Sequence, residues 1–272
     1  MTQPTLPQST VLITGAGSGL GRALARRYDS SGYAVCVADI REDRARETVA
    51  ALGGDPHWAM ACDVGSDASM EALRDAVHAR WPRLDVLVNN AGVASGGSLL
   101  DAPMDEWQWM LNLNLLGVVR GCRLFAPRMV AAGGGAIVNI ASFAGLAGAP
   151  GLMTYSVAKA GVVALSESLR AELYGNGVRV SVVCPSFFRT SLTENFRGNS
   201  QILEMANKLM DHARESADDI AASVFAQAQA GTFLILPTAA EAWRWRLKRF
   251  LPGVYFRKLL QLAGGRVAKG AP

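Results

Sequence analysis

The sequence predicts an α/β fold in which one doubly wound domain is built on a mostly parallel sheet of seven strands. Short apolar runs rich in valine and isoleucine alternate with longer amphipathic stretches between residues 10 and 236. This alternation is typical of repeated strand–helix units, whose strands run parallel. The first apolar run leads directly into a glycine-rich turn and a helix-like stretch, which is how a nucleotide-binding unit begins.

The individual elements follow from apolar runs and from helical spacing of apolar residues. Each predicted strand is a short apolar segment, and each predicted helix repeats apolar residues at intervals of three or four. We expect strands at residues 10–14, 34–38, 57–61, 85–88, 178–183 and 232–236, a loop followed by a strand within residues 133–141, and helices at residues 20–31, 42–52, 66–80, 104–130, 155–175 and 218–230.

Composition limits the class of protein. The chain has 272 residues, 50% of them hydrophobic, and 28 glycines, which suits one large core with many tight turns. It has no apolar run of about 18 residues that predicts a membrane span, and its start lacks the basic and apolar segments of a secretory signal. The four cysteines and three histidines form no ligand cluster, so we predict a cytoplasmic protein without a metal site.

The predicted domain organisation has three parts: a short polar arm at residues 1–9, one domain at residues 10–240, and a C-terminal extension at residues 241–272. The chain has 27 basic and 23 acidic residues. The extension holds eight of the basic residues and one of the acidic ones, which leaves 19 basic and 22 acidic residues elsewhere. The positive charge therefore belongs to the extension.

The turn after the first predicted strand has the pattern of a phosphate-binding loop. Thr14, Gly15, Gly19 and Gly21 read T-G-x-x-x-G-x-G, and Leu20 stands where the generic G-x-G-x-x-G pattern has its last glycine. A strand, a loop and a helix in this order place backbone N–H groups and a positive helix end where a pyrophosphate can bind. A flexible loop without a ligand is the weaker alternative, because a strand and a helix flank the turn.

Asp39, at the end of the second predicted strand, predicts a preference for NAD. A carboxylate at this place can accept hydrogen bonds from the adenosine ribose, and its charge repels the 2′-phosphate of NADP. It lies 24 residues after Gly15, close to the usual spacing. Because Arg41 is nearby, NADP remains the alternative cofactor.

Tyr155 and Lys159 form the pair that points most directly to catalysis. Residues four apart lie on one face of a helix. A phenol with a pKa near ~10 is a poor acid or base at neutral pH. We therefore expect the Lys159 ammonium to lower the pKa of Tyr155. The same spacing also arises by chance on exposed helix faces, so the other motifs must decide its meaning.

Taken together, these motifs resemble those of the short-chain dehydrogenase/reductase family, in its compact group. The resemblance covers roughly residues 10–236. It implies a Rossmann-type domain with strand order 3-2-1-4-5-6-7, a small-molecule alcohol or ketone substrate, and a homodimer or homotetramer. The matching features, in chain order, are the glycine pattern, Asp39, Asp63, residues 89–92, Asn114, Ser142, Tyr155, Lys159 and residues 185–190.

The resemblance also implies which residues act. The catalytic set is Asn114, Ser142, Tyr155 and Lys159, with Asn112 as the competitor of Asn114 and a helix–helix hydrogen bond as the alternative role of that amide. Ser186 departs from the family by replacing its usual glycine. The implied cofactor-binding residues are Thr14, Gly15, Ser18, Gly19, Leu20, Gly21, Asp39, Asp63, Val64, Asn90, Ala91, Gly92, Tyr155, Lys159, Pro185, Phe188 and Thr190.

The expected activity is hydride transfer between NAD and a secondary alcohol or ketone, with Tyr155 as acid and base. Residues 191–214 stand where the family keeps the segment that covers the substrate. Phe143, Leu152, Phe187 and Phe196 are the expected pocket residues, and they favour an apolar or bulky substrate. The alternatives are an NADPH-dependent ketoacyl-type reductase and a membrane-docked cofactor-binding protein with little turnover.

The extension predicts two amphipathic helices separated by a Pro-Gly break at residues 252–253. Trp243, Leu247, Phe250 and Leu251 fall at helical spacing, and basic residues lie between them. Packing on the same subunit or on a partner subunit is the main expectation. A peripheral contact with an anionic membrane is the alternative, and we expect no nucleic-acid binding.

Overall fold

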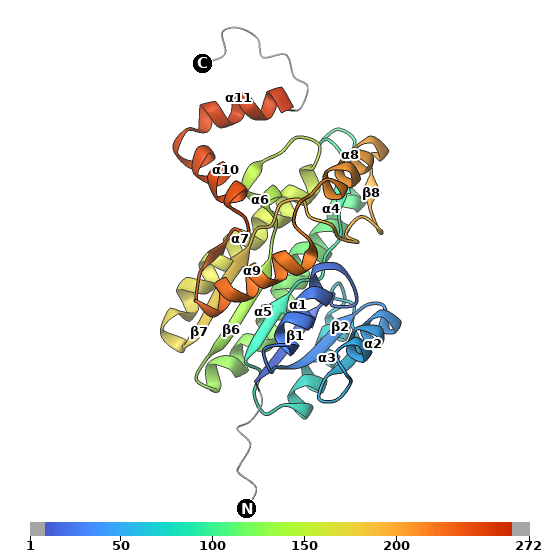
Figure 1. Ribbon diagram of the computed structural model, residues 1–272, viewed down its shortest axis with the longest axis vertical. Helices are drawn as coiled ribbons and strands as arrows, with labels where there is room; N and C mark the ends of the chain where they lie inside the picture. The colour runs from blue at the N-terminus through green and yellow to red at the C-terminus, as the bar shows by residue number, and fades with distance from the viewer. Residues whose placement is uncertain (1–8, 263–272) are drawn as a thin grey trace, which may run out of the picture.

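The computed structural model describes residues 9–262, and its centre is a seven-stranded parallel sheet (Figure 1). The predicted arm, apart from its last residue, and the end of the predicted extension lie outside the described residues. The strands of this sheet are β1 (Thr10–Thr14), β2 (Ala34–Asp39), β3 (Trp58–Ala61), β4 (Val86–Asn89), β6 (Gly135–Ile140), β7 (Val178–Val183) and β9 (Leu234–Ile235).

The strand order across the sheet is β3-β2-β1-β4-β6-β7-β9. Two further strands of two residues each, β5 (Ser95–Gly96) and β8 (Arg197–Gly198), pair with one another in a separate small sheet. Without this pair, the main sheet has the predicted order 3-2-1-4-5-6-7. The predicted α/β fold class is confirmed, and the β5–β8 pair is an addition that the sequence pattern did not indicate.

Helices connect the strands and cover both faces of the sheet. Their bounds are α1 (Gly19–Asp29), α2 (Glu42–Ala51), α3 (Asp67–Arg80), α4 (Met104–Leu111), α5 (Gly117–Ala131), α6 (Phe143–Ala147), α7 (Met153–Leu173), α8 (Ser200–Asp211), α9 (Ala217–Gln229), α10 (Ala239–Phe250) and α11 (Pro252–Leu262). The helix predicted at residues 104–130 is interrupted by a π-helical turn, η1 (Asn112–Leu116), and a single 3₁₀ turn, η2 (Tyr174–Asn176), follows α7.

The two faces of the sheet bury separate halves of the core. Along β1, Leu12 packs into the cluster that contains the apolar faces of α3, α5 and α7. Its neighbours Val11 and Ile13 pack into the cluster that contains α1 and α9, which lie in front of the sheet in Figure 1. A strand covered on both faces needs apolar residues at every position, and this explains why β1 is a continuous apolar run.

The C-terminal extension packs on the same subunit through α10 and α11, above α6 in Figure 1. The Lys248 ammonium donates to the carbonyl oxygen of Leu146, and the Tyr255 hydroxyl donates to the carbonyl of Ala147 at 3.2 Å. Both acceptors lie in the last turn of α6, where a cation is favourable. No helix within residues 9–262 is long and apolar enough to cross a membrane.

The predicted apolar face of the extension does not face the domain. Trp243 and Phe250 are 56% and 73% exposed, whereas Glu241 is buried and Trp245 packs against the core. The reason is polar: the Glu241 carboxylate accepts a hydrogen bond from the backbone N–H of Ser186. This contact turns the opposite side of α10 toward the domain.

Candidate active site

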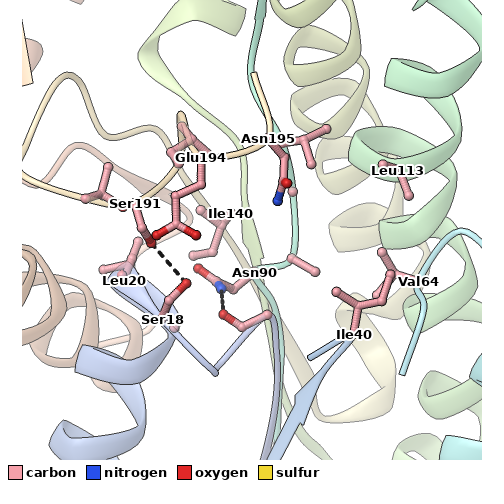
Figure 2. Close-up of a pocket in the computed structure, with 18 of the residues that line it drawn as sticks. Ser18, Leu20, Ile40, Val64, Asn90, Leu113, Ile140, Ser191, Glu194 and Asn195 are labelled. Carbon is pink, nitrogen blue, oxygen red and sulfur yellow. Dashed lines mark hydrogen bonds between the residues drawn. The ribbon is translucent and has the colours of Figure 1, made fainter. Parts of the chain in front are cut away.

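The carboxyl ends of the strands border one large cavity of about 720 Å³ (Figure 2). Ligands of parallel α/β sheets bind at this edge, where the chain crosses from one side of the sheet to the other. Of the predicted cofactor-binding residues, Thr14 alone is absent from the lining. The structure brings together at this cavity Gly15, Ser18, Gly19, Leu20, Gly21, Asp39, Asp63, Val64, Asn90, Ala91, Gly92, Ser142, Tyr155, Lys159, Pro185, Phe188 and Thr190.

Two glycines of the turn combine a left-handed backbone with no room for a Cβ. Gly15 has φ +64°, and a Cβ there would lie 2.7 Å from Cα of Ala91. Gly19 has φ +49°, and a Cβ there would lie 2.7 Å from Oγ1 of Thr190. Other residues rarely adopt this backbone conformation. The turn, followed directly by α1, leaves a cradle of backbone N–H groups that fits a pyrophosphate.

Thr14 does not line the cavity but connects the glycine turn to the residues that follow β4. Its hydroxyl accepts hydrogen bonds from the backbone N–H groups of Asn90 at 3.1 Å and Ala91 at 3.2 Å. The Asn90 amide in turn donates to the carbonyl of Thr14 at 2.9 Å. These bonds join the ends of β1 and β4, so they set the width of the cavity where a dinucleotide would cross it.

Asp39 stands at the end of β2, beside the glycine turn. Its carboxylate accepts from the backbone N–H groups of Gly17 and Arg41, each at 2.9 Å. Two arginines line the cavity nearby, and both are paired with carboxylates: Arg41 with Asp43 at 2.7 Å and Arg44 with Glu194 at 2.6 Å. The sequence prediction considered Arg41 and missed Arg44, which the first turn of α2 brings to the same edge.

Ser142 and Tyr155 meet at the opposite end of the cavity. Ser142 follows β6 and is the N-cap of α6. Its hydroxyl accepts a hydrogen bond from the backbone N–H of Ala144. Tyr155 lies in the first turn of α7 and is buried. Burial raises the pKa of Tyr155 to about 12, while a hydrogen bond with Ser142 acts to lower it.

Lys159 lies one turn along α7, on the same face as Tyr155. Its ammonium donates to the carbonyl of Ile140 at 2.9 Å and stands 5.9 Å from the centroid of the Tyr155 ring. Burial lowers the pKa of Lys159 from 10.5 to about 8. The expected lowering of the Tyr155 pKa by this cation is not seen, because burial is the largest influence on the pKa of both groups.

The π-helical turn η1 separates the two competing asparagines. The Asn114 amide donates to the carbonyl of Val93 at 2.8 Å and accepts from the N–H of the same residue at 2.9 Å. Asn112 turns away, and its amide donates to the carbonyl of Gly65 at 3.1 Å. Asn114 is fully buried and faces Gly92, where a Cβ would lie 2.6 Å from its Oδ1. Asn114 therefore does not line the cavity itself but contacts Gly92 and Val93, which do.

The predicted substrate residues are not brought together. Phe196 lines the cavity, but Phe143 is buried in the main core and Phe187 is 42% exposed. Leu152 forms a bridge with Gly97 instead. The apolar lining near Tyr155 comes from other residues, namely Val93, Trp109 and Leu192, whereas Leu113 lies beside Gly65 and Val64 (Figure 2). Trp109 lies in the helix predicted from residue 104, and its place in that helix was the one available signal.

The covering segment closes over the glycine turn through polar contacts. The Ser191 hydroxyl lies 3.0 Å from that of Ser18, and Figure 2 shows Ser191 and Glu194 above Ser18 and Leu20. Farther along, β8 pairs with β5 and α8 begins at Ser200. The first part of the segment expected at residues 191–214 therefore borders the cavity, through residues 191–192 and 194–197.

Ser186 fits its place without strained backbone. Within residues 9–262, every residue with a left-handed φ is a glycine, so the glycine expected at this position is not required. Its N–H is bonded to Glu241 of α10, a partner that the sequence did not indicate. The described residues also contain no group of three or more His, Cys, Asp or Glu side chains that could hold a metal ion.

Comparison with known proteins gives one consistent result. The model of the short chain dehydrogenase family matches residues 9–201. The chain is 40% identical over 189 residues to D-threitol dehydrogenase of Mycolicibacterium smegmatis, across 69% of this chain and 73% of that protein. It is 35% identical over 216 residues to meso-2,3-butanediol dehydrogenase of Serratia marcescens, across 79% and 85%. A short chain dehydrogenase/reductase from Burkholderia phymatum, solved in complex with NAD, superposes with a TM-score of 0.84 at 29% identity, across 97% of this chain and 98% of that chain.

Proposed function

The chain belongs to the short-chain dehydrogenase/reductase family, and on that premise we propose that it is a NAD-dependent oxidoreductase that interconverts a secondary alcohol and its ketone. The observation that carries this proposal is the meeting of Ser142, Tyr155 and Lys159 at one end of a cavity whose other end is a glycine turn. An acid–base group beside a dinucleotide cradle is what hydride transfer to or from an alcohol requires.

Each catalytic residue has a role that its contacts support. Tyr155 takes the hydroxyl proton as the carbinol carbon gives up its hydride, and Ser142 holds the same oxygen by a hydrogen bond. Lys159 lies beside Tyr155 and stabilises the phenolate form, which Tyr155 must adopt before it can take this proton. Asn114 anchors Val93 at the cavity wall and lies on a route by which the proton reaches solvent. NAD, when bound, supplies the hydride acceptor at C4 of its nicotinamide.

The proposed cofactor is NAD, with NADP as the weaker alternative. The Asp39 carboxylate stands where the adenosine ribose of a bound dinucleotide is expected. Arg41 and Arg44, the cations that line the cavity beside it, are already paired with Asp43 and Glu194. A 2′-phosphate would therefore meet a negative charge, and both neighbouring cations would already be neutralised. This arrangement weighs against the NADPH-dependent ketoacyl-type reductase.

The proposed substrate is a secondary alcohol that touches an apolar wall. Val93, Trp109 and Leu192 line the cavity and pack against the cluster that contains Tyr155. The two relatives described above are named for small polyols and diols, which supports alcohol oxidation. The apolar wall supports a substrate with a hydrocarbon part.

The test is NADH formation, followed by absorbance, with a panel of secondary alcohols. We expect turnover with NAD in the wild type and a loss of about 10²- to 10⁴-fold in kcat/KM for Tyr155→Phe, the usual contribution of general acid–base catalysis. NADH binding should persist in the variant. If neither direction gave turnover while NADH bound tightly, a cofactor-binding protein with little turnover would replace this proposal.

We also propose a homodimer or homotetramer in the cytoplasm, with the exposed Trp243, Phe250 and Phe256 covered by a partner subunit. Sedimentation velocity measures the assembly directly. Replacing the three aromatic residues with serine should lower the oligomeric state. Binding of the wild type to anionic vesicles, lost in the same variant, would instead support the membrane alternative.

A further inference from the structure

Arg197 is an exposed residue at the rim of the cavity, and its guanidinium has no charged partner among residues 9–262. Its side chain lines the cavity and lies 4.0 Å from the centroid of the Trp109 ring. Trp109 packs against the small cluster that contains Tyr155. The stacked pair therefore belongs to the same end of the cavity as the phenol, and not to the end that holds Asp39.

No carboxylate neutralises Arg197 within the described part of the chain. The ion pairs and side-chain hydrogen bonds of residues 9–262 include Arg44 with Glu194 at 2.6 Å, but none that involves the Arg197 guanidinium. The nearest acidic residue in sequence, Glu194, thus already forms an ion pair with Arg44. Stacking on an indole orients a guanidinium but leaves its five N–H donors free.

The backbone at Arg197 is held in place by the β5–β8 pair. The register aligns Ser95 with Arg197 and Gly96 with Gly198. The N–H of Asn199 donates to the carbonyl of Gly96 at 2.7 Å. Gly198 has φ +106°, and a Cβ there would lie 2.1 Å from the Gly96 carbonyl oxygen, so the two strands can approach only because this residue is glycine.

The β5 strand is in turn fixed to the helix that carries Tyr155. The hydroxyls of Ser95 and Thr154 are 2.6 Å apart, and Thr154 immediately precedes Tyr155. The N–H of Gly97 also donates to the carbonyl of Gly151 at 2.8 Å. A continuous chain of bonds therefore sets the position of Arg197 relative to the catalytic phenol.

From this placement we propose that the substrate is a secondary alcohol or ketone that carries an oxyanion group, a carboxylate, sulfonate or phosphate, which Arg197 binds. This inference rests on the proposed hydride-transfer function and names its substrate class. A guanidinium binds such groups by two parallel hydrogen bonds, and the planar fork matches them better than any neutral group.

The apolar wall and the cation together define the shape of this substrate. Val93 and Leu192 contact the hydrocarbon part near the reacting carbon, and Arg197 holds the charged end. Binding the charged end orients the carbinol toward Tyr155, which is the effect of a positioning contact on rate. The substrate is therefore a hydroxy acid or its sulfonate or phosphate analogue, with a short hydrocarbon chain between the two groups.

The experiment compares matched alcohols that differ only in charge. The probes are 3-hydroxybutanoate, 4-hydroxypentanoate and 5-hydroxyhexanoate against 2-butanol, 2-pentanol and 2-hexanol, with hydroxyalkyl sulfonates and phosphates of equal chain length as further arms. We expect kcat/KM for the best anionic probe to exceed that of its neutral partner by about 10- to 100-fold. Arg197→Met should reduce this ratio by the same factor, and Arg197→Lys should restore part of it.

Arg27→Met is the matched control. Arg27 lies on α1, its guanidinium stacks 4.7 Å from the centroid of the Phe225 ring, and it does not line the cavity. It should leave the ratio unchanged. Equal turnover of charged and neutral alcohols, or a ratio that Arg197→Met does not alter, would overturn the inference while leaving the proposed hydride transfer intact. Calorimetry with 4-oxopentanoate and the NAD complex, a pair that cannot react with one another, gives a second measure: no binding to the wild type would overturn the inference even if no alcohol were turned over.

Discussion

At the scale of single residues, burial sets the protonation of Tyr155 and Lys159, the pair proposed to be catalytic. Burial raises the pKa of Tyr155 to about 12 and lowers that of Lys159 to about 8. The i, i+4 spacing predicted that the two side chains share a face, and the structure places both at one cavity. It could not predict the carbonyl of Ile140 that binds the ammonium, because that contact comes from β6, far away in the sequence.

The lowered pKa of Lys159 predicts how stability changes with pH. Between pH 8 and pH 10.5 the folded chain has released a proton that the unfolded chain still holds. The contribution of Lys159 to stability therefore rises with pH in this window. The buried cysteines, whose pKa is raised by burial, act in the opposite direction, so the effect of Lys159 is measured as a difference between two proteins that share them. Lys159→Met removes this contribution. The free energy of unfolding of the wild type, minus that of the variant, should therefore increase by ~2 kcal/mol from pH 7 to pH 10.

Urea unfolding of both proteins at several pH values measures this difference. Above pH 10 the raised pKa of Tyr155 acts in the opposite direction, since the folded chain then holds the extra proton. The window must end there. Parallel stability curves for the two proteins between pH 7 and pH 10 would show that Lys159 has an ordinary pKa.

Asp39 predicts cofactor preference through charge alone. Asn has nearly the same shape and can keep its oxygen on the N–H of Gly17, while its NH₂ group then faces the N–H of Arg41. Asp39→Asn should therefore remove the repulsion of a 2′-phosphate at the cost of the bond to Arg41. The ratio of NADPH to NADH dissociation constants should fall by about 10- to 100-fold, measured by cofactor fluorescence. Asp55→Asn, an exposed carboxylate paired only with Arg80, is the control. Equal affinity of the wild type for both cofactors would contradict the assignment.

At the scale of elements, periodicity predicted the regular strands and helices well and the irregular pieces poorly. The strands at residues 10–14 and 178–183 appear with the predicted bounds, because buried parallel strands are continuous apolar runs. The π-helical turn at Asn112–Leu116 was not predicted, since one extra residue in a helical turn leaves almost no trace in the pattern. The pair of two-residue strands was also missed, because its partners are about a hundred residues apart.

The β5–β8 pair makes its own prediction. Gly198→Ala would place a Cβ against the Gly96 carbonyl, so the strand pairing should break and the covering segment should lose its position. We expect KM for the best alcohol to rise about 10-fold, as for other displaced positioning groups. Hydrogen exchange at the Asn199 amide should become faster at the same time.

Gly32→Ala separates backbone strain from this contact. Gly32 has φ +82°, and a Cβ added there would meet no other atom within 4 Å. Alanine at this position should therefore cost ~1–2 kcal/mol of stability without a change in KM. If Gly198→Ala and Gly32→Ala had the same effects, the strand pair would have no special role in the site.

At the scale of the whole molecule, the sequence predicted where the site lies but not how the C-terminal extension is attached to it. The motifs fall at the ends of successive strands, and the strand order brings those ends to one edge. The extension was predicted as two amphipathic helices, and α10 and α11 are present. Its inward face is set by the buried Glu241, a polar contact that apolar spacing cannot indicate.

This attachment links the extension to the cofactor edge of the cavity. Glu241 accepts from the backbone of Ser186 and from that of Thr238, and Ser186 lines the cavity. In Glu241→Gln, one acceptor oxygen becomes a donor that faces a donor. We expect a loss of ~1–3 kcal/mol in the free energy of unfolding and weaker NADH binding. Glu204→Gln, at an exposed position of α8, is the control and should change neither quantity. Unaltered NADH binding in Glu241→Gln would show that the extension is independent of the site.

The most direct test of the central claim is the transfer of deuterium from an alcohol to the cofactor. The best alcohol of the panel, labelled with deuterium at its carbinol carbon, is incubated with NAD and the enzyme, and the NADH is analysed by mass spectrometry and NMR. The account predicts one deuterium at C4 of the nicotinamide, and far slower formation of labelled NADH with Tyr155→Phe. NADH without deuterium, or labelled NADH formed equally fast by Tyr155→Phe, would contradict it.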